Sequence, residues 1–186
     1  MNNQTKQAFK QIFDHLKNEL QPTFIEETQL NLGSSALILG TGPEESLTSI
    51  INKIKNISQN TSIHIIVKPF LEAPMKTACG NKDFVYTYES NDSFELDKVH
   101  SILKKNRLTH FDSTIIAFNN TWGMGYENVL EIVKSLKPKQ AFAYNVENRW
   151  IQLSLSRLKN RIATLKLCTA MANWHWEEGY SSIDEW

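Results

Sequence analysis

The sequence lacks the residues that would indicate a disulfide-bonded, metal-binding or nucleic-acid-binding protein. It has only two cysteines, Cys79 and Cys168, which lie far apart in the chain and provide neither a disulfide framework nor a metal knuckle. Its five histidines are never spaced like metal ligands, so we expect no metal site. Lys and Arg together number 20, as do Asp and Glu, and this lack of a basic excess predicts no nucleic-acid partner.

Long apolar segments are also missing. The chain has no run of about 18 apolar residues, which argues against a membrane span, and residues 1–4 lack the apolar core of a signal peptide. Hydrophobic residues make up 41% and charged residues 22% of the 186 residues, which are ordinary values for a globular domain. We therefore expect one soluble, cytoplasmic domain, long enough to bury a core without a disulfide or a metal.

Short apolar runs alternate with helical patterns through the middle of the chain. The runs are bounded by turn residues such as Gly40 and Pro69, and their continuous apolar character is typical of strands buried on both faces. They cover residues 36–39, 63–67, 84–88, 113–118 and 141–145. This alternation predicts an α/β fold, a three-layer Rossmann-like domain with about five parallel strands joined by right-handed crossovers. We assume the strand order 3-2-1-4-5.

Both ends of the chain are predicted to add helices to this sheet. Residues 1–33 form an N-terminal helical extension, residues 34–149 the sheet core, and residues 150–174 a long C-terminal helix. Each of the two helices has one apolar face, which we expect to pack against the sheet layers. In the first helix this face consists of Phe9, Ile12, Phe13, Leu16 and Leu20.

Glycine-containing loops follow the first and the fourth predicted strands, at residues 40–42 and 119–125. In an open parallel sheet, ligands bind beyond the carboxyl ends of the strands, where the strand order reverses. With the assumed order, the reversal lies between these two loops. We therefore predict a ligand-binding cleft in which amide side chains bond hydroxyl groups and an aromatic ring stacks on the ligand. It is lined by Gly40, Thr41, Gly42, Asn119, Asn120, Trp122, Gly125 and Tyr126.

Structural roles for the same loops stay open. Glycines are needed in any tight strand-to-helix turn, and the third glycine of the dinucleotide fingerprint is missing. Glu44 and Glu45 occupy the positive helix end behind Gly42, so the first loop suits a neutral or cationic group better than a diphosphate. The second loop is equally well explained as a long turn that is capped by an Asn and covered by a Trp.

Other polar residues are weaker candidates. Glu89, Asn91 and Asp92 follow the third strand on the functional edge, where they could meet a ligand or form a solvated loop. Asp112 precedes the fourth strand, at the opposite end of the sheet, and is expected to cap or pair locally. No residue qualifies as a catalytic base, so the catalytic residues are left unassigned, and no cofactor is predicted.

The segment around the fourth strand resembles part of bacterial glycosyltransferase-type proteins. The pattern consists of Phe-Asp at residues 111–112, an apolar strand, Asn119-Asn120, and Gly-Tyr-Glu-Asn-Val at residues 125–129, and the likeness covers residues 110–145. It implies a glycosyltransferase-like Rossmann domain that handles a sugar or a nucleotide-sugar in bacterial envelope polysaccharide metabolism. Two-domain members of the family hold the sugar nucleotide mainly on a second, C-terminal half, which we expect this chain to lack. A chain that consists of the other half alone would bind an acceptor sugar, pair with another subunit, or be a relic.

A methyltransferase is the alternative. Residues 36–42, Ala-Leu-Ile-Leu-Gly-Thr-Gly, are similar to the glycine-rich first motif of S-adenosylmethionine-dependent enzymes. Those enzymes usually place an acidic residue at the end of the second strand for the ribose hydroxyls, where this chain has Lys68-Pro69 and only later Glu72. A sixth and a seventh strand are also not evident, unless residues 150–155 are extended.

The C-terminal residues suggest a further alternative, a non-catalytic interaction module. Aromatic residues are enriched at protein interfaces, so the aromatic and acidic tail over residues 175–186 predicts a homodimer or a partner subunit. The aromatic side chains could instead fold back and cover the sheet edge of their own chain. The aromatic residues concerned are Trp174, Trp176, Tyr180 and Trp186.

Overall fold

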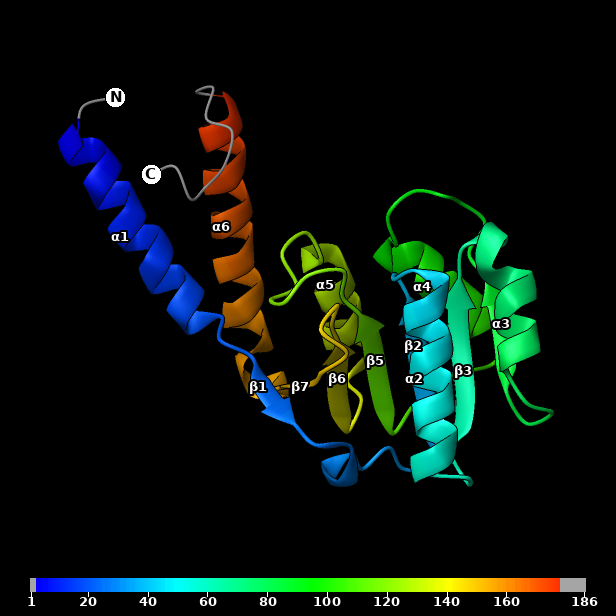
Figure 1. Ribbon diagram of the computed structural model, residues 1–186. Coiled ribbons are helices and arrows are strands. Elements are labelled where there is room, and N and C mark those ends of the chain that lie inside the picture. The colour runs from blue at the N-terminus through cyan, green and yellow to red at the C-terminus, as the bar shows by residue number, and fades with distance from the viewer. Residues whose placement is uncertain (1–2, 178–186) are drawn as a thin grey trace.

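The computed structural model describes residues 3–177 and contains one seven-stranded mixed sheet that is covered by helices (Figure 1). The strands lie in the order β1-β7-β6-β5-β2-β3-β4. Their bounds are β1 (Thr23–Ile25), β2 (Ser35–Gly40), β3 (Ser62–Val67), β4 (Phe84–Thr87), β5 (Ser113–Ala117), β6 (Gln140–Tyr144) and β7 (Trp150–Leu153). The helices are α1 (Asn3–Glu19), α2 (Glu44–Ile57), α3 (Glu72–Ala78), α4 (Leu96–Lys105), α5 (Glu127–Leu136) and α6 (Leu158–Glu177).

The α/β class is confirmed, and so are the five parallel strands at its centre. β4, β3, β2, β5 and β6 are adjacent and parallel, which is the assumed order 3-2-1-4-5. The strand order therefore reverses between β2 and β5. This is the position at which the two glycine-containing loops were expected to meet.

The sheet is larger than predicted, and partly antiparallel. β7 pairs antiparallel with β6, and β1 pairs antiparallel with β7, so β1 again runs in the direction of the five parallel strands. The predicted helix over residues 150–174 is wrong at its start, because Trp150 and Ile151 are buried in β7 and α6 begins at Leu158. The N-terminal extension is likewise not wholly helical, since it includes β1 and a 3-10 helix over Glu27–Gln29.

Alternate residues of each central strand face two separate cores, because successive side chains of a strand point to opposite faces. Ala36 and Ile38 of β2 pack with the apolar faces of α2 and α3. Leu37 and Leu39 face the other core, which is closed by α4, α5 and α6. The β-branched and leucine side chains of the central strands are thus covered on both faces, as their continuous apolar runs require.

The two terminal helices extend beyond the sheet, side by side (Figure 1). α1 contacts α6, and of its predicted apolar face Leu16 packs partly against the core whereas Ile12 is 48% exposed. None of the described helices is both long and apolar enough to cross a membrane. Of the C-terminal aromatic residues, Tyr180 and Trp186 lie outside the described residues.

Asp112 connects three segments at the amino ends of the strands. Its Oδ2 atom accepts hydrogen bonds from the backbone N–H and the hydroxyl of Ser34, both at 2.8 Å, and its Oδ1 atom lies 2.6 Å from Nζ of Lys139. The hydrogen bond from Lys139 and those from Ser34 hold the pKa of Asp112 well below its usual range. Gly33 adopts φ +69° directly against this carboxylate, where a Cβ atom would lie 2.4 Å from the Asp112 Cβ. The expected local pairing of Asp112 is confirmed.

Candidate functional site

The loop after β2 is packed tightly between the ends of two neighbouring strands. Thr41 donates a hydrogen bond from Oγ1 to the Ala117 carbonyl at the end of β5, at 2.9 Å. A Cβ atom on Gly42 would lie 2.7 Å from the Ala117 Cβ, and one on Gly40 would lie 2.7 Å from Cγ1 of Val67 in β3. Both glycines are therefore required for close packing of the strand ends, and the loop does meet β5 at the reversal of the sheet.

The loop after β5 is organised by the side chain of Asn120. Its Oδ1 atom accepts hydrogen bonds from the backbone N–H groups of Trp122, Gly123 and Met124, at 3.2, 2.6 and 3.1 Å. Its Nδ2 atom donates to the Met124 carbonyl at 2.9 Å and to Oδ1 of Asn119 at 3.1 Å. The amide of Asn120 thus closes the turn, as expected of an Asn that caps a loop.

Tyr126 stabilises the same loop from inside. It is buried, its ring packs edge-on against Phe118 with centroids 4.9 Å apart, and its hydroxyl accepts a hydrogen bond from the backbone N–H of Asn119 at 3.0 Å. Burial raises the pKa of this phenol. The backbone of Gly123, at φ +85°, packs so closely on the Phe118 ring that a Cβ atom would lie 2.6 Å from the Cζ atom of Phe118. Gly125, at φ +80°, precedes α5. The left-handed conformation explains the choice of glycine at both positions.

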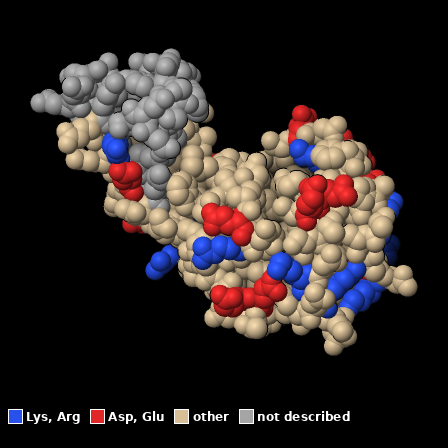
Figure 2. Space-filling view, viewed as in Figure 1, with Lys and Arg blue, Asp and Glu red and all other residues tan. Residues whose placement is uncertain are grey.

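A cavity of about 1110 Å³ lies beside these loops at the carboxyl edge of the sheet. Lys68 follows β3, the loop after β4 supplies residues 91–95, and α5 begins with Glu127 and Asn128. The opposite wall comes from α6 through Lys166, Thr169, Ala170 and Asn173. Figure 2 shows the upper edge of the molecule hollowed between the part around α6 and the part that is topped by the loop after β4, the uppermost segment on the right of Figure 1. None of the eight predicted cleft residues lines this cavity, which begins one residue beyond Tyr126.

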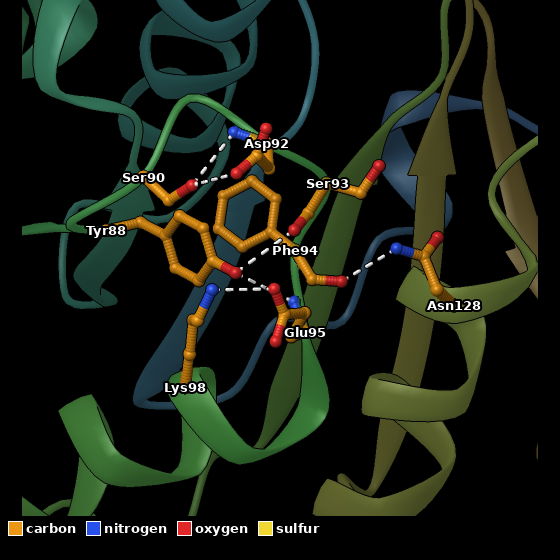
Figure 3. A network of polar contacts seen from close by, with 8 residues as sticks. All are labelled: Tyr88, Ser90, Asp92, Ser93, Phe94, Glu95, Lys98 and Asn128. Carbon is orange, nitrogen blue, oxygen red and sulfur yellow. Dashed lines mark hydrogen bonds and ion pairs between the residues drawn. The ribbon is translucent and has the colours of Figure 1, made fainter.

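The loop after β4 is held in one conformation by its own polar contacts (Figure 3). The Tyr88 hydroxyl donates to the Ser93 carbonyl and accepts from the backbone N–H of Glu95, each at 3.0 Å. The Tyr88 ring packs on Phe94 at 4.6 Å between centroids. Asn128 of α5 then donates from Nδ2 to the Phe94 carbonyl at 2.7 Å. The loop after β4 and the start of α5, which both line the cavity, are therefore connected directly by a hydrogen bond.

Carboxylates outnumber ammonium groups in the cavity lining. Among the described lining residues, four carboxylates, on Asp92, Glu95, Glu127 and Glu131, stand beside the ammonium groups of Lys68 and Lys166. Glu127 accepts a hydrogen bond from the Thr169 hydroxyl at 2.6 Å, and Glu131 lies 2.9 Å from Nζ of Lys134 and 3.6 Å from Nζ of Lys166. The hydrogen bond from Lys134 lowers the pKa of Glu131, so this carboxylate stays ionised at neutral pH. Glu95 likewise lies 2.6 Å from Nζ of Lys98, so Lys98 and Lys134 offset two of the four carboxylates. No surplus of basic groups is therefore placed here to hold a diphosphate, whereas neutral hydroxyl groups need none.

Two further positions bear on the chemistry of this edge. Lys68 occupies the end of β3, and its Nζ atom donates to the Asn91 carbonyl at 2.8 Å. Glu72 does not line the cavity. Its carboxylate accepts a hydrogen bond from the Thr87 hydroxyl at 2.6 Å and pairs with Lys76 at 2.5 Å. Among residues 3–177, no group of three His, Cys, Asp or Glu side chains is placed to hold a metal ion.

The sequence contained signals for some of the lining residues. Asn91 and Asp92 stood on the expected functional edge, and Asn128 belongs to the Gly-Tyr-Glu-Asn-Val pattern at residues 125–129. Thr169 and Asn173 are one helical turn apart on α6, but nothing local to that helix predicts which element it covers. No protein-family model and no curated protein matches the chain.

Proposed function

We propose that the chain is a glycosyltransferase-like domain of bacterial envelope polysaccharide metabolism that binds a sugar in the cavity at the carboxyl edge. The observation that carries the proposal is the lining of that cavity, in which carboxylate, amide and hydroxyl groups lie around the exposed, apolar Leu96 side chain without a surplus of basic groups. Carboxylates and amides accept hydrogen bonds from sugar hydroxyls, and a few polar groups placed in an apolar wall fix the orientation of a small ligand.

The basic groups at this edge favour the sugar itself over its nucleotide diphosphate. Glu44 and Glu45 stand at the start of α2, where a diphosphate would otherwise meet the positive helix end. A diphosphate is normally held by helix N-termini, Lys or Arg, and the described lining offers Lys68, which donates to the Asn91 carbonyl, and Lys166, which lies 3.6 Å from Glu131. A neutral acceptor sugar is therefore the ligand class that we propose.

A second candidate is an S-adenosylmethionine-dependent methyltransferase. It is favoured by the two strands that the sequence did not reveal, because β7 and β1 extend the five parallel strands to seven. The glycine loop after β2 also lies against the end of β5, at the reversal of the strand order. Two observations count against this candidate. Lys68 stands where such enzymes usually have an acidic residue for the ribose, and the Glu72 carboxylate already binds Thr87 and Lys76.

Isothermal titration calorimetry with a ligand panel separates the two candidates. The panel contains neutral hexoses and N-acetylhexosamines, their UDP, GDP and CDP derivatives, and S-adenosylmethionine. Saturable binding of a neutral sugar supports the first proposal, whereas binding of S-adenosylmethionine alone replaces it with the second. Failure of every ligand would contradict both and favour a non-catalytic interaction module.

A pair of aspartate variants tests whether the sugar binds in the cavity. Asp92 lines the cavity and Asp97 lies on α4 outside it, and both side chains are exposed. Replacing Asp92 with Ala should weaken sugar binding by about tenfold, because a hydrogen bond to a charged group is lost. Asp97→Ala removes the same charge and should leave the affinity unchanged. Equal affinities for the two variants would place the sugar elsewhere.

A further inference from the structure

A second cavity, of about 400 Å³, lies where α6 begins beside the outer strands of the sheet. Its floor is formed by the paired residues Thr23 of β1 and Gln152 of β7. The wall comes from Arg157, at the end of the 3-10 helix over Leu155–Arg157, and from the first turns of α6. Arg157 and Arg161 are four residues apart, as are Asn160 and Thr164, so these side chains share one face. No residue of this cavity lines the carboxyl-edge cavity.

Arg161 carries a half-buried charge without an acidic partner. Its Nη1 atom donates to the Leu20 carbonyl at 3.2 Å and its Nη2 atom to the Trp122 carbonyl at 2.8 Å, while Nε is buried and has no hydrogen-bond partner. No carboxylate of the described residues forms an ion pair with it. Burial lowers the pKa of this guanidinium, which means that its surroundings disfavour the charged form. The side chain nevertheless stays charged, because arginine is not deprotonated in proteins. Buried charges are usually paired, and this one has only carbonyl oxygens.

Arg157 brings a second guanidinium to the same cavity. It lies four residues before Arg161, is exposed, and also forms no ion pair among the described residues. Glu19 is the single carboxylate among the described lining residues, so the two arginines give this lining a net positive charge. Asn160 and Gln152 add neutral amide groups that can donate hydrogen bonds.

We propose that this cavity binds a phosphate group between Arg157 and Arg161. The exposed guanidinium of Arg157 presents its N–H groups as a planar fork that matches the oxygens of a phosphate, and the charge of Arg161 and the neighbouring amides add to the attraction. The bound phosphate supplies the counter-charge that Arg161 lacks. Because Arg161 also holds the Trp122 carbonyl, the phosphate would be connected through one side chain to the loop after β5. This proposal does not depend on the identity of the ligand in the first cavity.

The test uses inorganic phosphate as the probe, titrated into the full chain in a calorimeter at pH 7 and low ionic strength. Saturable binding at one site per chain is expected, and Arg157→Ala should weaken it by about tenfold or more, since a charge-assisted contact is lost. Lys159→Ala is the matched control. It removes one positive charge from the same exposed turn of the chain but does not line the cavity, so its affinity should stay within about twofold of the native value.

Because Arg157 is exposed, its replacement should not unfold the protein. The melting temperature of each variant, measured without phosphate, checks that a loss of binding is not a loss of folding. The proposal is overturned by the absence of saturable phosphate binding to the native chain, or by equal affinities of Arg157→Ala and Lys159→Ala. Acetate, titrated in parallel, distinguishes a phosphate site from a carboxylate site. Tighter binding of acetate than of phosphate would also overturn the assignment.

Discussion

Asn128 at the start of α5 donates a hydrogen bond to the carbonyl of Phe94, 34 residues earlier in the chain, at 2.7 Å (Figure 3). This bond joins the loop after β4 to the loop-helix junction after β5, and both segments line the carboxyl-edge cavity. The bond holds these two lining segments together without a ligand. Preformed cavities are usual for small-molecule sites.

Removal of this bond should loosen the cavity. We expect Asn128→Ala to lower the free energy of unfolding by about 1 kcal/mol, which is the usual net value of one hydrogen bond. Amide exchange over residues 89–95 should become faster, because the Phe94 carbonyl is no longer held by α5. Asn173→Ala, on the exposed wall of the same cavity, is the control and should change neither quantity. Unchanged exchange in Asn128→Ala would show that the loop is held by its internal contacts alone.

Gly42 should not tolerate a side chain. A Cβ atom there would lie 2.7 Å from the Ala117 Cβ, so we expect Gly42→Ala to destabilise the protein by about 1–3 kcal/mol through overpacking. The nearest atom to a Cβ on Gly80 is Oδ2 of Asp83 at 3.4 Å, which makes Gly80→Ala a suitable control with little expected change. Urea unfolding of both variants measures the difference. Equal stabilities would mean that the ends of β2 and β5 can separate without cost.

Asp112 should make stability depend on pH in the acid range. Its pKa is lowered in the folded protein, by the hydrogen bond from Lys139 first and by those from Ser34 next. The resulting stabilisation is therefore fully present above the unfolded-state pKa, about 3.9, and is lost as the pH falls through the lower folded-state value. The native chain should exceed Asp112→Asn in stability at pH 6, and the difference should shrink below about pH 4. Asp97→Asn is the control, and a gap between native and Asp112→Asn that does not change with pH would contradict the assignment.

Much of the central sheet could be predicted from the sequence, because each strand is specified locally. The continuous β-branched run at residues 63–67 leaves little choice other than a buried strand, and the same holds for residues 113–117. β1 and β7 were missed for a physical reason. They have three and four residues, too few for a periodic pattern, and the apolar residues of β7 continue into the spacing of α6.

The site could be predicted only as far as its position on the sheet. The adjacency of the loops after β2 and β5 follows from the strand order, which the sequence suggested. Whether an Asn bonds a ligand or its own backbone cannot be known from its residue type, and Asn120 uses its amide within the loop. The wall formed by Thr169 and Asn173 depends on how α6 packs against α5, which is a property of the whole fold.

We also propose that the chain associates through its C-terminal region. Sedimentation velocity of the full chain should show a dimer, whereas a chain that ends at Asn173 should sediment as a monomer. The shorter chain lacks the aromatic residues Trp174, Trp176, Tyr180 and Trp186, and aromatic side chains are enriched at interfaces. A monomer in both cases, with lower thermal stability in the shorter chain, would mean that these residues pack against their own chain.

The most direct test is to map the bound sugar on the isotope-labelled full chain by NMR titration. The neutral sugar that binds most tightly in the calorimetric panel is added, and chemical shift changes are followed for backbone and side-chain amides. We predict that the largest changes cluster at residues 91–96, 127–131 and 166–173, with the side-chain amides of Asn91 and Asn128 among them. Changes confined to residues 40–42 and 119–126, or no saturable change with any neutral sugar, would contradict sugar binding in the carboxyl-edge cavity.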